Sequence, residues 1–154
     1  QRQQGFIKAL DDAGMAQLSW IDCHFRGGMA IDATRESFRR ADRPDAIFVG
    51  NDFMAFGVIE TLQVEFGLSA PDDVSIIGFD DVEMAAWKIY DLTTIRQPIN
   101  RMVTATVDLL FELIEGGGDG PIRIEIESEL VIRGSTRSQA SIAAAEHDRK
   151  ITRL

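Results

Sequence analysis

Four side chains that could bind a small polar molecule occur at widely separated points of the chain. Arg2 stands near its start, Phe25 lies in a short polar stretch before a glycine pair, and Asn51 and Asp80 each follow an apolar run. Carboxylate and amide groups hydrogen-bond hydroxyl groups or ring nitrogens, and an aromatic ring stacks on the apolar face of a sugar or nucleobase. These residue types therefore predict the binding of a small sugar- or nucleobase-like ligand.

Each of these residues also has a simpler interpretation. An aspartate after a strand, such as Asp52, Asp80 or Asp81, caps the next helix about as often as it binds a ligand. Phe25 alone is more often a core residue than a stacking platform, and Arg2 alone is more often a solvated surface residue. The binding hypothesis therefore depends on these side chains meeting at one place in the fold.

The sequence lacks the residue sets that nucleophilic or nucleotide-dependent enzymes use. It contains two histidines, His24 and His147, and no Gly-x-Ser-x-Gly turn, so a catalytic triad lacks its parts. His24 directly follows the single cysteine, Cys23, at the end of a predicted strand, where adjacent residues point to opposite faces. No phosphate or dinucleotide glycine loop follows a predicted strand. We therefore predict no catalytic residue, no cofactor, no metal site and no internal disulfide.

The charge of the chain argues against direct contact with DNA. Its 154 residues carry a formal net charge of −9, whereas a DNA-binding surface needs clustered Lys and Arg. The only loosely basic stretch, residues 35–43, is interrupted by Glu36 and Asp42. If the intact protein binds DNA, we expect a segment absent from this chain to do so.

We also predict a cytoplasmic protein that does not contact a membrane. No apolar run approaches the roughly 20 residues that cross a bilayer, and the first residues lack the basic-then-apolar pattern of a signal peptide.

Alternating strands and helices position the candidate residues. Apolar runs predict strands at residues 18–23, 45–49 and 74–79, the last two buried on both faces. Helical spacing predicts helices at residues 3–13, from a Gly27–Gly28 turn to about residue 41, and at residues 52–66, the last capped by Asp52. Such units form an α/β, doubly wound parallel sheet. The carboxyl ends of its strands share one edge, where ligands bind, so we expect the four candidate side chains to meet there.

The remaining residues predict a second group of elements. Residues 82–89 are predicted as a short helix and residues 93–96 as extended chain. Pro98 opens a helix to residue 115 with a wide apolar stripe. Strands are predicted at residues 122–127 and 129–133, and residues 138–154 as a mobile tail. Because a doubly wound domain normally begins with a strand, we expect the chain to be a fragment that lacks its first strand.

Several motifs resemble those of the LacI/GalR family of lactose-repressor-type regulators. They are RQQGF at residues 2–6, PDAIFVGNDFMAFG at 44–57, PDDVSIIGFDD at 71–81, LTTIRQP at 92–98 and LVIRGST at 130–136. Each motif alone is weak, but their order and spacing make the resemblance specific, and it covers residues 2–137.

The resemblance implies a type I periplasmic-binding-protein-like fold of two lobes, with an effector in the cleft between them and a homodimeric assembly. By motif position, Arg2, Asn51 and Asp80 fall on effector-contacting positions, and Phe25 falls where the family often has a stacking ring. It also implies a division of the chain: residues 1–92 form the C-terminal lobe without its first strand, 93–127 belong to the N-terminal lobe, 128–137 close the C-terminal lobe, and 138–154 are the tail. The DNA-binding headpiece is absent.

The leading prediction is therefore an effector-sensing, dimerising module of a LacI-type transcription regulator, which reaches DNA only through a missing headpiece. A periplasmic sugar-binding protein of a transporter is the alternative, since it shares the fold but would carry an export signal. A doubly wound enzyme comes third, because it would need a cofactor loop that the sequence lacks. Asn, Asp, Arg and Phe serve sugars and nucleobases alike, so the residues leave the effector's identity open.

Overall fold

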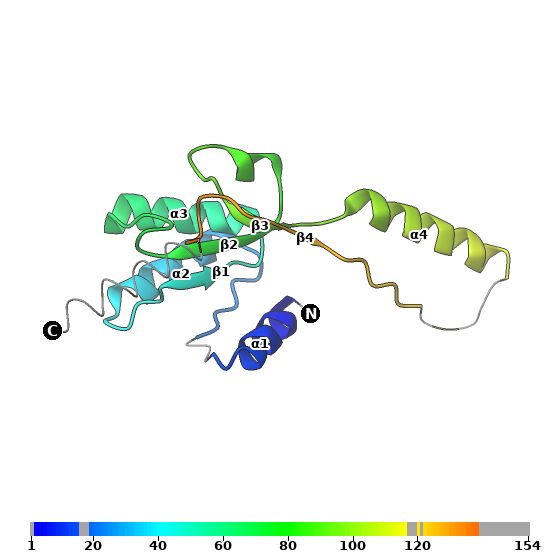
Figure 1. The fold of residues 1–154 in the computed structure, drawn as a ribbon, viewed down its shortest axis with the longest axis horizontal. Helices are drawn as coiled ribbons and strands as arrows, with labels where there is room; N and C mark the ends of the chain where they lie inside the picture. Colours follow the sequence, from blue (N-terminus) through cyan, green and yellow to red (C-terminus); the bar gives the residue numbers. More distant parts are fainter. Residues whose placement is uncertain (1, 16–18, 117–119, 121, 139–154) are drawn as a thin grey trace.

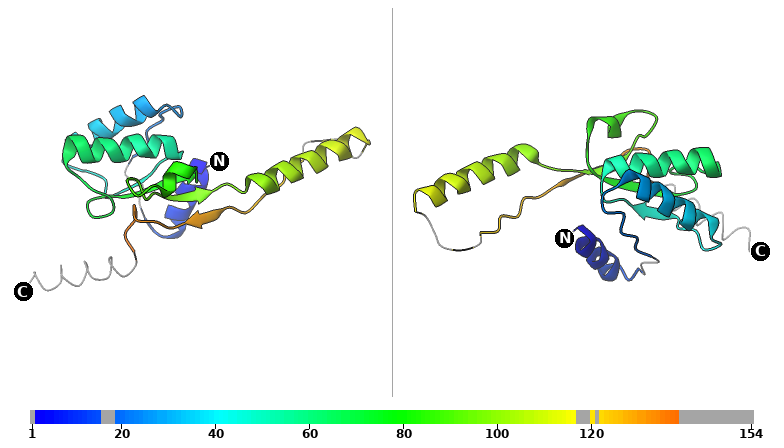
Figure 2. Two further views of the ribbon diagram at one scale, coloured as in Figure 1. Left: turned by 90° about the horizontal axis from the view of Figure 1, so that it is seen from above. Right: turned by 180° about the vertical axis from the view of Figure 1, so that it is seen from behind.

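The computed structural model describes residues 2–15, 19–116, 120 and 122–138. Its centre is a four-stranded sheet in the order β1-β2-β3-β4 (Figure 1). Helices α2 and α3 lie together on one side of the sheet and α1 lies on the other (Figure 2). The strands are β1 (Ala46–Phe48), β2 (Ser75–Asp80), β3 (Thr93–Arg96) and β4 (Glu129–Val131). The helices are α1 (Arg2–Asp12), α2 (Gly27–Arg39), α3 (Asp52–Phe66), the short 3-10 helix η1 (Glu83–Ala86) and α4 (Ile99–Ile114).

The first three strands run parallel, and β4 runs antiparallel to β3. Ile47 pairs with Ile76 between β1 and β2, and Gly78 pairs with Thr94 between β2 and β3. Ile95 pairs with Leu130 at the antiparallel step. The predicted α/β class with a mainly parallel sheet is confirmed, and the carboxyl ends of β1, β2 and β3 share one edge.

Helix α3 contributes more buried apolar side chains to the core than any other element of the described chain. Its buried side chains include Phe56, Ile59 and Leu62, which are at most 4% exposed. At its end, Gly67 takes the left-handed conformation at φ +65°, which suits a residue without Cβ. At its start, the Asn51 side chain accepts a hydrogen bond from the Met54 N–H.

The prediction that Asp52 caps α3 is wrong, because Asn51 is the cap. Asp52 is the first helical residue and is fully buried, with its carboxylate directed into the sheet. The negative charge therefore still lies in the first turn, where the helix dipole favours it.

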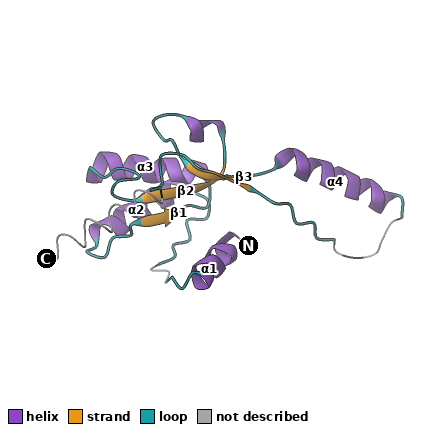
Figure 3. Cartoon of the chain, in the orientation of Figure 1, coloured by secondary structure: helices purple, strands orange, loops and turns teal. Residues whose placement is uncertain are grey.

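Two strand predictions need correction at the β1 side of the sheet. Residues 20–23 form no strand, since within the described residues they join none of the four strands and β1 is the edge of the described sheet (Figure 3). Burial of residues 45–49 on both faces is also wrong: Ala46 is exposed, and Ile47 and Phe48 are half-buried. Both errors have one cause, because each prediction assumed a neighbouring strand that the described residues do not supply.

Helix α4 and the stretch after it extend away from the sheet (Figure 1). No residue of α4 is buried, and Ile99, Phe111 and Ile114 are at least 59% exposed. The predicted strand at residues 122–127 is not formed, because these residues lie alone as extended chain without a paired neighbour in the described region. Residues 139–154, most of the predicted tail, lie outside the described residues. No helix in the described ranges is long and apolar enough to span a bilayer.

Candidate functional site

Arg2 joins the start of α1 to two strand ends. Its Nη1 donates a hydrogen bond of 2.6 Å to the Gly50 carbonyl, which follows β1. Its Nη2 lies 3.6 Å from Asp80 Oδ1, at the end of β2. The guanidinium also stacks on the Phe79 ring, with 3.8 Å between Cζ and the ring centroid. Arg2 is thus held in place by a carbonyl, a carboxylate and an aromatic face rather than solvated freely.

Asp80 also contacts a side chain that follows β3. Gln97, one residue beyond β3, donates a hydrogen bond from Nε2 to Asp80 Oδ1. The Asp80 side chain remains 25% exposed, so a ligand can reach it. Its backbone has φ +127°, a conformation that residues with a Cβ rarely adopt, and strain of this kind is common at binding sites.

Asn51 lies at the same edge of the sheet, and its side-chain oxygen is already used in a hydrogen bond within the protein. Its Oδ1 accepts the capping hydrogen bond from Met54 N–H at 2.8 Å. Its Nδ2 makes no hydrogen bond within the described residues, so it is left as a donor for a ligand hydroxyl or carbonyl. The neighbouring Gly50 carbonyl receives Arg2, which brings Asn51 close to the Arg2–Asp80 pair.

Phe25 is on the surface rather than in the core. Its side chain is 67% exposed, and Arg2 Cζ lies 5.8 Å from its ring centroid. His24 and Phe25 form a turn with positive φ values of +47° and +55°, which presents the ring outside the sheet edge. The arginine therefore lies near two rings, Phe25 and Phe79.

The sequence prediction missed Phe79 and Gln97. Both could have been found by extending the strand-end rule, because Gln97 follows β3 just as Asn51 follows β1. Phe79 was assigned only to the strand, and its role as the platform under Arg2 depends on side-chain packing that spacing does not reveal.

A second carboxylate, Asp81, sits directly behind the exposed edge. Its Oδ2 accepts a hydrogen bond of 2.6 Å from Arg96 Nε and its Oδ1 accepts one of 2.7 Å from Arg133 Nη2. Burial of the Asp81 carboxyl opposes its ionisation, but the hydrogen bonds from Arg133 and Arg96 outweigh burial and lower its pKa below the ordinary value. Asp81 thereby ties together the ends of β2 and β3 and the chain that follows β4.

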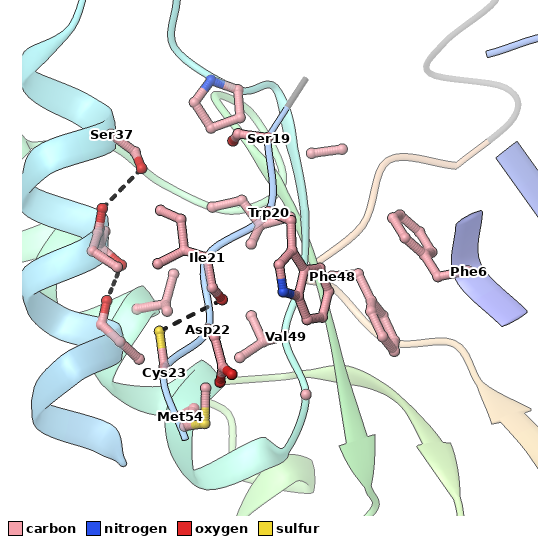
Figure 4. A pocket seen from close by; sticks show the side chains of 18 of the residues that line it. Phe6, Ser19, Trp20, Ile21, Asp22, Cys23, Ser37, Phe48, Val49 and Met54 are labelled. Carbon is pink, nitrogen blue, oxygen red and sulfur yellow. Dashed lines mark hydrogen bonds between the residues drawn. The ribbon is translucent and has the colours of Figure 1, made fainter. Parts of the chain in front are cut away.

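A separate cavity of about 330 Å³ lies between residues 19–25 and β1 (Figure 4). Its lining is mainly apolar and contains neither Arg2 nor Asp80. Phe25 and Gly50 border both the cavity and the polar edge. The cavity therefore lacks the charged groups of the candidate site and is a different feature of the molecule.

The chemistry of the polar edge suits reversible binding of a small polar molecule. It combines a carboxylate, an amide donor, a guanidinium and an exposed ring at the carboxyl ends of parallel strands. Within the described residues, no group of three or more His, Cys, Asp or Glu side chains is arranged to hold a metal ion.

Comparison with known proteins gives a consistent result. The model of the family "Periplasmic binding protein-like domain" matches residues 1–136. The chain is 36% identical over 139 residues to the HTH-type transcriptional repressor PurR of Photobacterium profundum, covering 89% of the chain and 41% of that repressor. It is 40% identical over 145 residues to the PurR of Mannheimia succiniciproducens, covering 91% and 42%. The chain thus spans about two fifths of these relatives.

Solved structures agree with the sequence relatives. The lac repressor dimer bound to operator and the anti-inducer ONPF superimposes with a TM-score of 0.80 at 27% identity, over 89% of the chain and 47% of the repressor. A LacI family regulator from Enterococcus faecium with bound ribose gives a TM-score of 0.74 at 31% identity, over 88% of the chain and 50% of the regulator. These relatives are transcription regulators, which agrees with the prediction of a non-enzymatic module. The chain therefore belongs to the periplasmic binding protein-like domain family, in the form found in LacI-type transcription regulators.

Proposed function

We propose that this chain is the effector-sensing part of a LacI-type transcription regulator and that Arg2, Phe25, Asn51 and Asp80 contact the effector. The observation that carries this proposal is the convergence of Arg2 and Asp80, 3.6 Å apart, at the carboxyl edge of the sheet. Arg2, Asn51 and Asp80 come from separate segments of the sequence, and a purely structural role would not require a solvent-accessible carboxylate with φ +127°.

A sugar or a nucleobase-like molecule fits this set of groups. The relatives include a regulator solved with cellobiose and another with ribose. Asp80 and the Asn51 amide would hydrogen-bond hydroxyl groups, and Phe25 would stack on an apolar sugar or base face. DNA would be contacted by a headpiece outside this chain, since the chain carries a net charge of −9.

We also propose that the arm formed by α4 and residues 122–127 belongs to a second lobe that completes the effector cleft. It leaves the sheet through β3 and returns through β4, and its helix buries no residue in the described chain. A helix with this apolar stripe requires a covering partner.

Because the lac repressor relative is a dimer, we further propose that the chain self-associates through exposed apolar surface. Light scattering should show a concentration-dependent dimer, weakened by Phe111→Glu and unchanged by Glu112→Gln.

The binding proposal is tested by a thermal-shift screen of sugars and nucleobases against the longest polypeptide that carries this chain. A ligand that raises the melting temperature should lose its effect in Asp80→Ala, because the carboxylate contact is removed. Asp72→Ala is the matched control, since Asp72 is also an aspartate beside β2 but lies before the strand, at the opposite edge. Equal ligand responses in both variants would overturn the proposed role of Asp80.

A further inference from the structure

The arm formed by α4 and residues 122–127 meets the sheet at its base. The chain leaves the sheet at Arg96, the last residue of β3, and returns at Glu129, the first residue of β4, and these two residues pair across the antiparallel ladder. Beyond this step no residue of α4 is buried, and the helix extends away from the other elements (Figure 1). Among the described residues, the contacts at the base therefore decide which way the arm points.

The Arg96 side chain lies between two carboxylates at the base of the arm. Its Nε donates a hydrogen bond of 2.6 Å to Asp81 Oδ2, just after β2, and its Nη1 donates one of 3.0 Å to Glu129 Oε2. The guanidinium is planar and its N–H groups have fixed directions, so two acceptors on different segments hold its orientation. Arg96 thus connects the strand before the arm, the strand after it and the end of β2.

Asp81 is itself held in one position. Its side chain is 7% exposed, and its Oδ1 accepts a hydrogen bond of 2.7 Å from Arg133 Nη2. Arg133 is bound in turn beside the start of β3, because its Nη1 donates to the Leu92 carbonyl and its backbone N–H donates to Thr93 Oγ1. The contact with Arg133 leaves the other oxygen of Asp81 for Arg96. Asp81 is therefore a fixed acceptor for the side chain at the base of the arm.

Gln97 makes a second connection at the base, since its Nε2 donates a hydrogen bond to Asp80 Oδ1. This hydrogen bond ends on a carboxylate that is 25% exposed and that also contacts Arg2. The Arg96 hydrogen bond ends on the nearly buried carboxylate of Asp81. The Asp81 carboxylate is therefore the more rigid of the two acceptors.

A small rotation at the base becomes a large displacement at the far end of α4. With a rise of about 1.5 Å per residue, the 16 residues of the helix span about 24 Å, so a rotation of about 10° at its start moves its end by roughly 4 Å. Solvent-exposed ion pairs add little to folding stability, and Arg96 is 49% exposed. The contact of Arg96 with Asp81 therefore has more influence on the direction of the arm than on unfolding.

We propose that Asp81 is a positioning residue that fixes the direction of the arm relative to the sheet, through its hydrogen bond with Arg96. Asp81 does not need to touch a ligand for this role. The inference concerns the base of the arm and holds for any ligand at the neighbouring edge, so it does not depend on the proposed effector contacts. Loss of the hydrogen bond lets the arm adopt several directions, while the sheet and the helices α2 and α3 keep their structure.

The test measures the distance between two spin labels by pulsed electron paramagnetic resonance. Cys23→Ala removes the native thiol, and the labels are attached to cysteines introduced by Val64→Cys on α3 and Glu112→Cys on α4, both at exposed positions. An excess of unlabelled chain with the same substitutions, and no ligand, ensures that the signal reports distances within one chain. The parent should give one narrow distance distribution, and Asp81→Asn should broaden it by about twofold or more.

Arg96→Met is the second variant, because it removes the half-exposed partner and leaves the buried one in place. It should broaden the distribution as much as Asp81→Asn does. Arg40→Met is the matched control, since Arg40 also forms an exposed ion pair, with Asp42, but follows α2 outside the base of the arm. It should leave the distribution unchanged. A second pair of labels, attached after Glu36→Cys on α2 and Lys88→Cys beyond η1, should keep its distance in every variant and so report that the sheet stays folded.

A broad distribution in the parent chain would overturn the proposal, and so would a narrow one that Asp81→Asn and Arg96→Met both leave unchanged. Equal broadening by Arg40→Met and Arg96→Met would also overturn it, because the loss of any ion pair would then have the same effect. If Asp81→Asn alters the distance between the labels at positions 36 and 88, its effect on the arm comes from unfolding, and the result for Arg96→Met then decides.

Discussion

The Thr94 hydroxyl donates a hydrogen bond of 2.6 Å to Asp52 Oδ1, and both residues are fully buried. The other carboxylate oxygen of Asp52 accepts the Val82 N–H at 3.0 Å. One buried carboxylate thus links α3, β3 and the chain after β2, directly beneath the edge that carries Asp80. The hydrogen bonds of the buried Asp52 carboxylate therefore help to hold in place the strand ends that form the candidate site.

Replacing Asp52 with alanine should lower the free energy of unfolding by about 2–4 kcal/mol, because the buried Thr94 hydroxyl and the partly buried Val82 N–H would both lose their acceptor. Urea denaturation would measure the change. Thr94→Val in the Asp52→Ala background should cost less than it does alone, since the hydroxyl has then already lost its acceptor. Additive effects would show that the two residues act independently.

Asn51 is expected to serve both the helix and the ligand, and two substitutions separate these roles. Asn51→Ala removes the cap and should destabilise the fold by about 1 kcal/mol. Asn51→Ser keeps a capping oxygen but loses the Nδ2 donor, so its stability should stay close to that of the parent chain. Calorimetric titration with the effector identified by screening should show weaker binding in both variants. Unchanged affinity in Asn51→Ser would restrict Asn51 to capping.

Asp81 should make the stability of the domain depend on acid pH. Its pKa is lower in the folded state than in the unfolded chain, whose carboxyl has a pKa of about 3.9. Its contribution is therefore present above that value and is lost as the pH falls through the lower folded pKa. Asp81→Asn should destabilise the chain by about 1–3 kcal/mol at pH 7 and by less at pH 2.

Asp42 provides the control for this experiment. Its pKa is also lowered by a hydrogen bond from an arginine, Arg40, but the pair is exposed to solvent. Asp42→Asn should therefore leave the urea midpoint unchanged at either pH, because exposed ion pairs add little to stability. An equal response of both variants would mean that burial of the Asp81 pair has no effect.

Gly78 is required by the space around it rather than by its backbone conformation. A Cβ at this position would overlap Asp52 Oδ1 and lie 2.9 Å from Leu92 Cδ2. Gly78→Ala should therefore destabilise the fold by about 1–3 kcal/mol, measured by thermal and urea melts. Gly28→Ala is the comparison, because Gly28 lies inside α2 with nothing within 4 Å of its added Cβ, so this change should be neutral or stabilising.

The sequence was sufficient for features that depend on local pattern. The apolar run before Gly78 and the helical spacing up to Gly67 predicted β2 and α3 correctly, because both elements find their partners within the chain. The convergence of Arg2 with the end of β2 also followed from the rule that parallel strands end at one edge.

Features that depend on a neighbour distant in the sequence could not be predicted from local pattern. Residues 20–23 and 122–127 have strand-like sequences, yet neither joins a strand of the described sheet. Propensity describes how a segment fits a sheet, and it does not state whether the adjacent strand is present. Likewise, the choice between Asn51 and Asp52 as cap depends on which residue leaves helical geometry first.

Asp80 and Asp81 are consecutive residues with φ values of +127° and +56°, conformations that glycine adopts with less strain than aspartate does. Glycine at position 80 would relieve the backbone strain but would remove the partly buried carboxylate, so folding and the proposed effector contact place opposite demands on this residue. A library selected only for heat resistance should drift toward glycine there, whereas one selected for response to the effector should retain aspartate. The identity of residue 80 in a population would thus record which of the two pressures had acted on it.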